Sequence, residues 1–137
     1  MKNKQTILLV EDDIVDQMTV KRALKDINVT NPLKIANNGE KALEYLMDKE
    51  HELPGIILLD LNMPRMNGIE LLKIIKDDNS IKRIPVVVLT TSREEQDRIR
   101  TFDLGIAGYM VKPVDYLQFV ELIKTINLYW TLSESAE

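Results

Sequence analysis

The sequence contains no cysteine, and His51 is the one histidine among its 137 residues. Disulfides, thiolate catalysis and cysteine-ligated metals are therefore excluded, and so is a metal site built from several histidines. The longest purely apolar runs, such as Ile56 to Leu59, are far too short to span a bilayer. The first six residues also lack the apolar core of a signal peptide. We therefore expect a cytoplasmic protein with no membrane partner.

Neither sign of charge predominates, because the chain has 18 Lys and Arg and 22 Asp and Glu, which give a formal net charge of −4. A mildly acidic chain of this kind does not favour direct binding to nucleic acid or to anionic membranes. The length fits one ordinary domain. We expect a single domain over residues 1–130, followed by a short C-terminal tail over 131–137.

Short β-branched or leucine-rich runs alternate along the chain with segments of helical length and pattern. Because the runs lack apolar/polar alternation, they predict strands that are buried on both faces, as in a parallel sheet. The alternating order predicts an α/β sandwich with right-handed crossovers, containing five strands and five helices. The predicted strands are Thr6–Val10, Leu33–Ala36, Ile56–Leu59, Val86–Leu89 and Tyr109–Val111.

Polar residues near the helix ends predict how the helices begin and end. Asn37 with Glu40 predicts a capping box at the second helix, and Ser92 with Glu95 predicts one at the fourth. Gly105 lies where a left-handed helix cap is expected.

The last two helices differ in their apolar content. The fourth helix is apolar mainly at Ile99 and Phe102, so we expect a weak hold on the core. The last helix has an apolar stripe of roughly 180°, wider than the ~100° that one core face needs. It is either packed deeply or offers an additional face to a partner, and we predict a homodimer through the last two helices. The stripe comprises Tyr116, Phe119, Val120, Leu122, Ile123, Ile126, Tyr129 and Trp130.

Polar side chains follow four of the predicted strands. In a doubly wound sheet, ligands bind beyond the carboxyl ends of the strands. Carboxylates brought together there need a divalent cation or must hold protons, and hard oxygen ligands suit Mg²⁺ with room for a phosphate. A lysine and a threonine hydroxyl can then contact phosphoryl oxygens. The residues are Glu11, Asp12 and Asp13 after the first strand, Asp60 after the third, Thr90 after the fourth and Lys112 after the fifth.

Four stretches of the chain resemble the receiver domain of bacterial response regulators, the CheY-like superfamily. The resemblance runs from about Thr6 to Ile126. It implies a flavodoxin-like three-layer α/β sandwich, with a five-stranded parallel sheet in the order 2-1-3-4-5 and five helices. The stretches are ILLVEDD at Ile7–Asp13, ILLDLNMPRMNG at Ile57–Gly68, PVVVLTTS at Pro85–Ser92 and AGYMVKP at Ala107–Pro113.

The resemblance also implies roles for the acidic residues. Asp60 matches the phosphoacceptor, which takes a phosphoryl group from a phosphohistidine on a sensor histidine kinase. Glu11 and Asp12 match the acidic pair that binds Mg²⁺, with Asp12 as a direct ligand and Glu11 acting through water. Asn62 matches the residue whose backbone carbonyl binds the metal. Asp13 we interpret as a helix cap.

The remaining roles concern the switch. Lys112 matches the lysine that pairs with the phosphoryl group, and its bond to Pro113 is expected to be cis. Thr90 matches the hydroxyl that moves toward that group. Tyr109 matches the aromatic residue that turns inward into the vacated space, although it can also be read as a half-exposed strand residue without a switch role.

Two further stretches are similar to stand-alone receivers of the cyanobacterial phytochrome response-regulator type. They are LTTSREEQD at Leu89–Asp97 and the aromatic end at Leu128–Trp130. This similarity implies a partner that is a sensor histidine kinase of the phytochrome type, or a phosphotransfer protein. Because the chain ends soon after its last helix, we expect no DNA-binding output domain.

Two other functions compete with this one. A Mg²⁺ phosphohydrolase of the haloacid-dehalogenase kind also phosphorylates an aspartate after a strand. It needs a second aspartate two residues further on as general acid, and that position is Asn62. A phosphorylation-independent interaction domain is disfavoured because the full set of site residues is present. We therefore expect a signalling module and not an enzyme.

Overall fold

The computed structural model of the chain describes residues 5–64 and 66–132, in which five strands and five helices alternate. Every predicted strand is found, with ends that differ from the prediction by one residue at most. The strands are β1 (Ile7–Val10), β2 (Leu33–Ala36), β3 (Ile56–Leu59), β4 (Val86–Thr90) and β5 (Gly108–Val111). The helices are α1 (Ile14–Asp26), α2 (Gly39–Met47), α3 (Gly68–Asp77), α4 (Glu95–Asp103) and α5 (Tyr116–Leu132).

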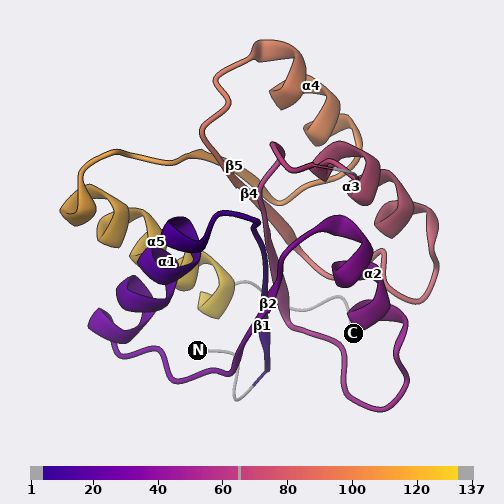
Figure 1. Cartoon of the computed structure of the whole chain (residues 1–137), viewed down its shortest axis with the longest axis horizontal. Helices are drawn as coiled ribbons and strands as arrows, with labels where there is room; N and C mark the ends of the chain where they lie inside the picture. Colours follow the sequence, from indigo (N-terminus) through magenta and orange to yellow (C-terminus); the bar gives the residue numbers. More distant parts are fainter. Residues whose placement is uncertain (1–4, 65, 133–137) are drawn as a thin grey trace.

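The strands form one parallel sheet in the order β2-β1-β3-β4-β5, which confirms the predicted fold. Helices α1 and α5 cover one face and α2 and α3 cover the other, while α4 lies toward the β5 side (Figure 1). Because β1 and β3 end level, with Val10 opposite Leu59, the residues that follow them emerge side by side.

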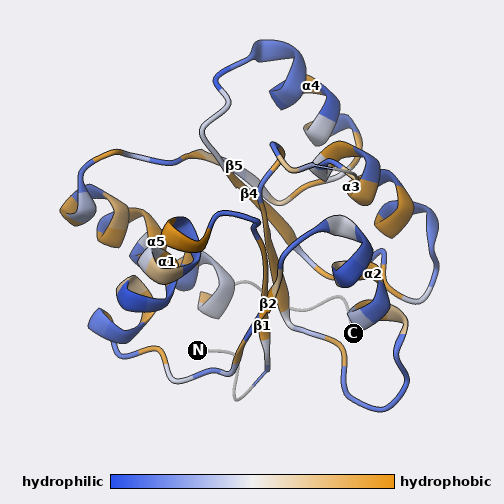
Figure 2. Cartoon of the chain, viewed as in Figure 1, coloured by the Kyte–Doolittle hydropathy of each residue, from blue (hydrophilic) through white to orange (hydrophobic). Residues whose placement is uncertain are grey.

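The core consists of two apolar layers, one on each face of the sheet. Successive strand side chains point to opposite faces. Leu8 and Val10 of β1 therefore pack beneath α2 and α3, whereas Ile7 and Leu9 pack beneath α1 and α5. Figure 2 shows the apolar character concentrated in the central strands and the largely hydrophilic α4 outside them.

The expectation of burial on both faces holds for β1, β3 and β4 but is wrong for the two edge strands. Every residue of β5 is only half-buried, and Lys34 in β2 is exposed. The reason is their position, since an edge strand has a neighbouring strand on one side only.

Two of the predicted helix caps are confirmed. Asp13 caps α1, with its Oδ1 atom accepting a hydrogen bond from the backbone N–H of Asp16 at 3.1 Å. Gly105 follows α4 with a φ of 91°, a left-handed conformation that glycine adopts without steric cost.

The cap predicted at Asn37 for α2 is wrong. Asn38 caps this helix, accepting from the Lys41 N–H at 2.8 Å. The side chain of Asn37 is engaged elsewhere, because its Oδ1 accepts a 2.9 Å hydrogen bond from Gln17 of α1.

The capping box predicted at Ser92 is also wrong, because α4 starts later, with Glu94 as a cap residue that makes no side-chain bond. The Ser92 hydroxyl instead donates to Asp97 at 2.7 Å. The capping box that does form is at α3, between Asn67 and Glu70.

The last two helices leave apolar side chains in solvent. In α4, Ile99 and Phe102 are both 50% exposed, and Thr101 is the buried residue. In α5, one side is buried and the C-terminal half exposes Leu128, Tyr129 and Leu132. The buried side of α5 consists of Phe119, Ile123, Ile126 and Trp130.

Helix α5 continues to Leu132, two residues beyond the predicted domain boundary at 130. The rest of the predicted tail, residues 133–137, lies outside the described residues. Within the described part of the chain, no helix is both long enough and apolar enough to cross a membrane.

Candidate functional site

The strand ends are joined by backbone hydrogen bonds that continue the sheet beyond the strands themselves. The N–H of Asp60 donates to the carbonyl of Val10 at 3.0 Å, and the N–H of Lys112 donates to the carbonyl of Thr90 at 2.8 Å. These bonds set Asp60 beside Glu11 and Lys112 beside Thr90. The sheet therefore brings the predicted site residues together at the carboxyl ends of its strands.

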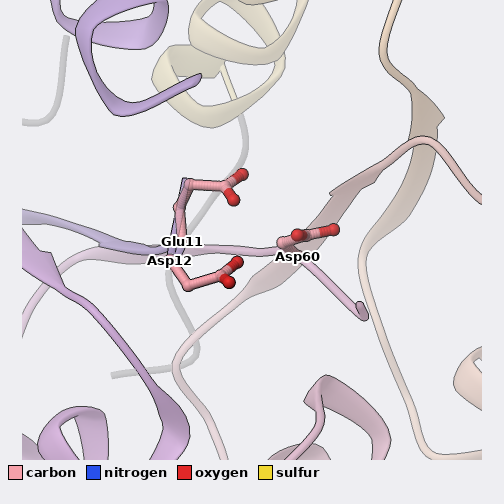
Figure 3. A group of neighbouring side chains, drawn as sticks. All are labelled: Glu11, Asp12 and Asp60. Atoms are coloured by element: carbon pink, nitrogen blue, oxygen red, sulfur yellow. The ribbon is translucent and has the colours of Figure 1, made fainter. Parts of the chain in front are cut away.

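Glu11, Asp12 and Asp60 form a group of carboxylates, each with an oxygen within 4.8 Å of the others. Figure 3 shows the Glu11 and Asp12 carboxylates extending toward Asp60. Glu11 and Asp60 are 2% and 6% exposed, whereas Asp12 faces solvent. Hard oxygen donors at this spacing, with one open side, fit a single divalent cation.

Lys112 lies among these carboxylates, with a side chain that is only 7% exposed. Its Nζ atom donates to Glu11 Oε1 at 2.5 Å and to Asp16 Oδ2 at 2.8 Å. Asp60 Oδ2 is 4.0 Å from Nζ, an ion pair beyond hydrogen-bond distance. Lys112 thus lies close to Asp60 without being bonded to it.

The prediction of a cis bond between Lys112 and Pro113 is wrong, because the described residues contain no cis peptide bond. A bond preceding proline favours trans by about 0.5–1 kcal/mol when nothing around it selects cis. The ammonium reaches Glu11 and Asp16 with the trans bond in place.

Burial and charge shift the proton affinities of the two central groups. Burial raises the pKa of Glu11 to about 7, with Asp60 acting in the same direction and Lys112 opposing both. Burial by itself would lower the pKa of Lys112, but its hydrogen bonds to Asp16 and Glu11 outweigh burial and raise that pKa. The site therefore carries surplus negative charge near neutral pH, which a proton or a metal cation relieves.

Asp16 belongs to this cluster, and sequence reasoning missed it. It lies in the first turn of α1, and 96 residues of sequence separate it from Lys112. The available signal was its place in the first turn of the helix that begins directly after Glu11, Asp12 and Asp13. A second missed residue, Gln17, donates to the backbone carbonyl of Glu11 at 2.7 Å and so holds the β1–α1 turn.

The predicted switch residues lie on β4 and β5. Thr90 is fully buried, and its Oγ1 accepts a 3.3 Å hydrogen bond from the N–H of Ser92. Tyr109 is half-buried, and its hydroxyl donates to the carbonyl of Ser92 at 3.0 Å. Through its own hydroxyl, Ser92 bonds Asp97 in the first turn of α4. Ser92 therefore connects Thr90, Tyr109 and the start of α4 through hydrogen bonds.

The loop after β3 is packed tightly against the backbone of Asp60. The N–H of Asn62 donates to Asp60 Oδ1 at 3.4 Å, and the Asn62 side chain is exposed. Gly68, which begins α3, donates its N–H to the carbonyl of Leu61 at 3.1 Å. A Cβ atom on Gly68 would lie 2.5 Å from the carbonyl oxygen of Asp60, so only glycine fits without a shift.

Large apolar side chains are exposed on the elements beside the site. They lie on the first turns of α1, on the loop after β5 and at the start of α5. Removing such side chains from water by a partner lowers the free energy and so favours binding. They are Ile14, Val15 and Met18, at 64–71% exposure, together with Val114 and Leu117, which are more exposed still.

Comparison with known proteins finds relatives along almost the whole chain. A model of the response regulator receiver domain matches residues 7–124. The response regulator Rcp1 of Synechocystis sp. is 38% identical over 130 residues, which cover 92% of this chain and 88% of Rcp1. The crystal structure of the phosphorylated cyanobacterial phytochrome response regulator RcpA has a TM-score of 0.90 at 34% identity, covering 97% of this chain and 99% of that chain. The Mn²⁺-bound form of Rcp1 has a TM-score of 0.87 at 35% identity, covering 96% and 97%.

Proposed function

The chain belongs to the response regulator receiver domain family of two-component signalling, and on that premise we propose that Asp60 is its phosphoacceptor. The observation that carries this assignment is the position of the Asp60 carboxylate. It is buried, lies within 4.8 Å of the oxygens of two other carboxylates and is 4.0 Å from the Lys112 ammonium. In this position, the Lys112 ammonium and a metal bound by the neighbouring carboxylates can balance the negative charge of an incoming phosphoryl group.

In the proposed reaction, an Asp60 oxygen attacks the phosphorus of a phosphohistidine in line. The new O–P bond forms as the P–N bond breaks, and the bonding pair leaves with the imidazole nitrogen. Lys112 pairs with a phosphoryl oxygen during the transfer. The protein contributes mainly by positioning the groups and stabilising charge, because a loose transition state requires little covalent chemistry from it.

Mg²⁺ is the proposed metal, held by Glu11, Asp12 and Asp60 with the backbone carbonyl of Asn62. Mg²⁺ suits this set because it prefers oxygen ligands and keeps several waters while it contacts a phosphate. When bound, it would offset negative charge shared by the carboxylates and the phosphoryl group. The spacing of the three carboxylates supports a divalent ion at this position, and a relative with a Mn²⁺-bound form supports binding of such an ion.

The proposed output is a shift between two states of the surface formed by α4, β5 and α5. Thr90 turns its hydroxyl toward the phosphoryl group, Tyr109 fills the space, and Ser92 carries the change to α4. The support is the chain of hydrogen bonds that links Thr90, Tyr109 and Asp97 through Ser92. A shift of this kind is limited by the differential contacts of the phosphoryl group with the two states.

The proposed partner is a sensor histidine kinase, of the phytochrome type, or a phosphotransfer protein. The exposed apolar side chain of Ile14 begins α1 shortly after Glu11, and that of Val114 follows Lys112 in the β5–α5 loop. The relatives named as phytochrome response regulators support the kinase type. We further propose that the chain acts as a stand-alone receiver and not as an enzyme.

A homodimer through α4 and α5 is the second proposed assembly. Ile99 and Phe102 of α4 and Leu128, Tyr129 and Leu132 of α5 are all exposed, which leaves apolar surface on both helices. Sedimentation equilibrium is expected to show a dimer in at least the phosphorylated state. Monomer under both conditions overturns the dimer and leaves the phosphoacceptor assignment intact.

The proposed function is tested by intact-mass spectrometry after incubation with Mg²⁺ and acetyl phosphate. We expect the mass gain of a single phosphoryl group in the natural chain and none in Asp60→Asn. A gain that survives in Asp60→Asn assigns the wrong nucleophile. No gain in either chain, together with no transfer from a phosphorylated kinase, favours an interaction domain that works without phosphorylation.

A second measurement separates signalling from hydrolysis. A phosphohydrolase of the haloacid-dehalogenase kind needs an acidic group two residues after the nucleophile, and Asn62 supplies none. We expect no steady-state phosphate release from ordinary monoesters. Sustained turnover on p-nitrophenyl phosphate would restore the enzyme hypothesis.

A further inference from the structure

Among the site side chains described above, the Asp16 carboxylate contacts only the ammonium group of Lys112. Its Oδ2 atom accepts the 2.8 Å hydrogen bond from Nζ, while its backbone N–H is held by the capping oxygen of Asp13 at 3.1 Å. The helix cap therefore fixes where the Asp16 side chain starts. The Asp16 carboxylate is 38% exposed, on the solvent side of a lysine that is 7% exposed.

The hydrogen-bonding capacity of the lysine decides what Asp16 does. An ammonium group carries three N–H donors. Glu11 and Asp16 accept two of them, and Asp60 lies at 4.0 Å, too far to accept the third. A phosphoryl group on Asp60 would extend its oxygens into this remaining gap. Lys112 can therefore meet the phosphoryl group with its third donor while it keeps both existing bonds.

Glu11 alone is a weaker anchor for this geometry than Glu11 and Asp16 together. Glu11 belongs to the carboxylate group that fits a metal ion, and Asp16 does not. A cation in that group competes with Lys112 for the charge of Glu11, because both are drawn to the same carboxylate. Asp16 is outside this competition and can hold Lys112 when the metal site is filled.

We propose that Asp16 is a positioning residue that holds the Lys112 ammonium beside Asp60 with one N–H left for the phosphoryl group. This inference rests on the proposed function, since it needs Asp60 to be the phosphoacceptor. The competing interpretation is a partly exposed ion pair with no functional effect, because pairs of that kind commonly contribute little. The two interpretations differ in whether Asp16 acts through Lys112.

The test is a double-mutant cycle on the rate of phosphorylation, followed by intact mass with acetyl phosphate and Mg²⁺. Asp16→Asn is expected to slow phosphorylation about threefold to tenfold, which corresponds to roughly 0.7–1.4 kcal/mol in the barrier. Asp16→Glu keeps the charge and is expected to recover most of the rate. In a Lys112→Ala background, which we expect to be slower itself, Asp16→Asn is expected to have no further effect.

Glu121→Gln is the matched control, because it also removes one negative charge. Glu121 pairs with Lys124 on α5 and is 72% exposed, so we expect a rate within about twofold of the natural chain, as for surface pairs in general. Urea unfolding of each variant checks that a lower rate is not a loss of folded protein.

Three outcomes overturn the proposal, and they are distinguishable. An unchanged rate in Asp16→Asn means that the ion pair has no functional effect. An equal slowing in the Lys112→Ala background, or in Glu121→Gln, means that Asp16 acts through net charge and not through Lys112. If the natural chain accepts no phosphoryl group from acetyl phosphate or from a kinase, the proposed function fails and this inference fails with it.

Discussion

Gly68→Ala is expected to disturb both the stability of the fold and the position of the phosphoacceptor. The added Cβ would lie 2.5 Å from the carbonyl oxygen of Asp60 and 2.7 Å from the Cα atom of Leu61, where ordinary contacts begin at 3.4 Å. Both neighbours are backbone atoms, so no side-chain rotation relieves the overlap. The start of α3 or the end of β3 must shift by several tenths of an ångström.

The expected cost follows from two opposing effects. Overpacking of this kind costs about 1–3 kcal/mol, whereas replacing glycine stabilises by roughly 0.4–1 kcal/mol through the unfolded state. Because backbone atoms must move, we expect the upper part of the range, a net loss of about 2 kcal/mol. With a urea m-value of about 2 kcal/mol/M, the unfolding midpoint should fall by about 1 M. Phosphorylation of Asp60 by acetyl phosphate should slow as well, because its backbone is displaced.

Gly108→Ala is the matched control. A Cβ atom at this position in β5 would meet only Met110 Cε at 3.5 Å and Val87 Cγ1 at 4.0 Å, both ordinary contacts. We expect stability that is unchanged or raised by up to about 1 kcal/mol. If Gly68→Ala is as stable as the natural chain to within about 0.5 kcal/mol, a typical surface effect, and is phosphorylated at the same rate, the overlap at Gly68 constrains neither the fold nor Asp60.

Three further predictions concern the metal site, the core and α4. Below the pKa of about 7 that burial confers on Glu11, a metal must displace a proton, so Mg²⁺ affinity measured by calorimetry should fall about tenfold per pH unit; a flat profile between pH 5 and 7 contradicts this. Trp130→Ala, at a side chain that is 3% exposed, should cost about 3–5 kcal/mol in urea unfolding, and a loss under 1 kcal/mol would show that α5 is not anchored there. Ser92→Ala removes the 2.7 Å bond to Asp97, which at about 1 kcal/mol should speed exchange of the Arg98 amide, which donates to the Glu94 carbonyl, roughly fivefold; unchanged exchange would mean that this bond does not hold the helix.

Local features of this chain could be predicted where neighbours in sequence are also neighbours in space. The apolar runs identified every strand, and Asp13 was correctly interpreted as a cap because a cap bonds backbone only a few residues away. The same rule was available for Asn67 and Glu70, which form the capping box of α3 and were overlooked. The grouping of Glu11, Asp12 and Asp60 followed from the parallel order of the strands, since their carboxyl ends share one edge.

Features that depend on competition between distant groups could not be predicted. Asn37 is the cap predicted from the sequence because Glu40 lies three residues later, and the use of Asn38 instead depends on Gln17, which engages Asn37 from another helix. The division of α5 into a buried side and an exposed side depends on which side of it packs against α1 and the sheet. The partial exposure of β5 depends on its place at the edge of the sheet.

Periodicity and strand-end chemistry are local properties, so the order of the elements, the parallel sheet and the residues that follow its strands could be predicted from the sequence. How those residues are bonded to one another depends on the folded structure. Lys112 is shared between Glu11 and Asp16, 101 and 96 residues away, and stays 4.0 Å from Asp60. An ammonium group has several carboxylates within reach in such a site, and its choice depends on relative positions that no local pattern encodes.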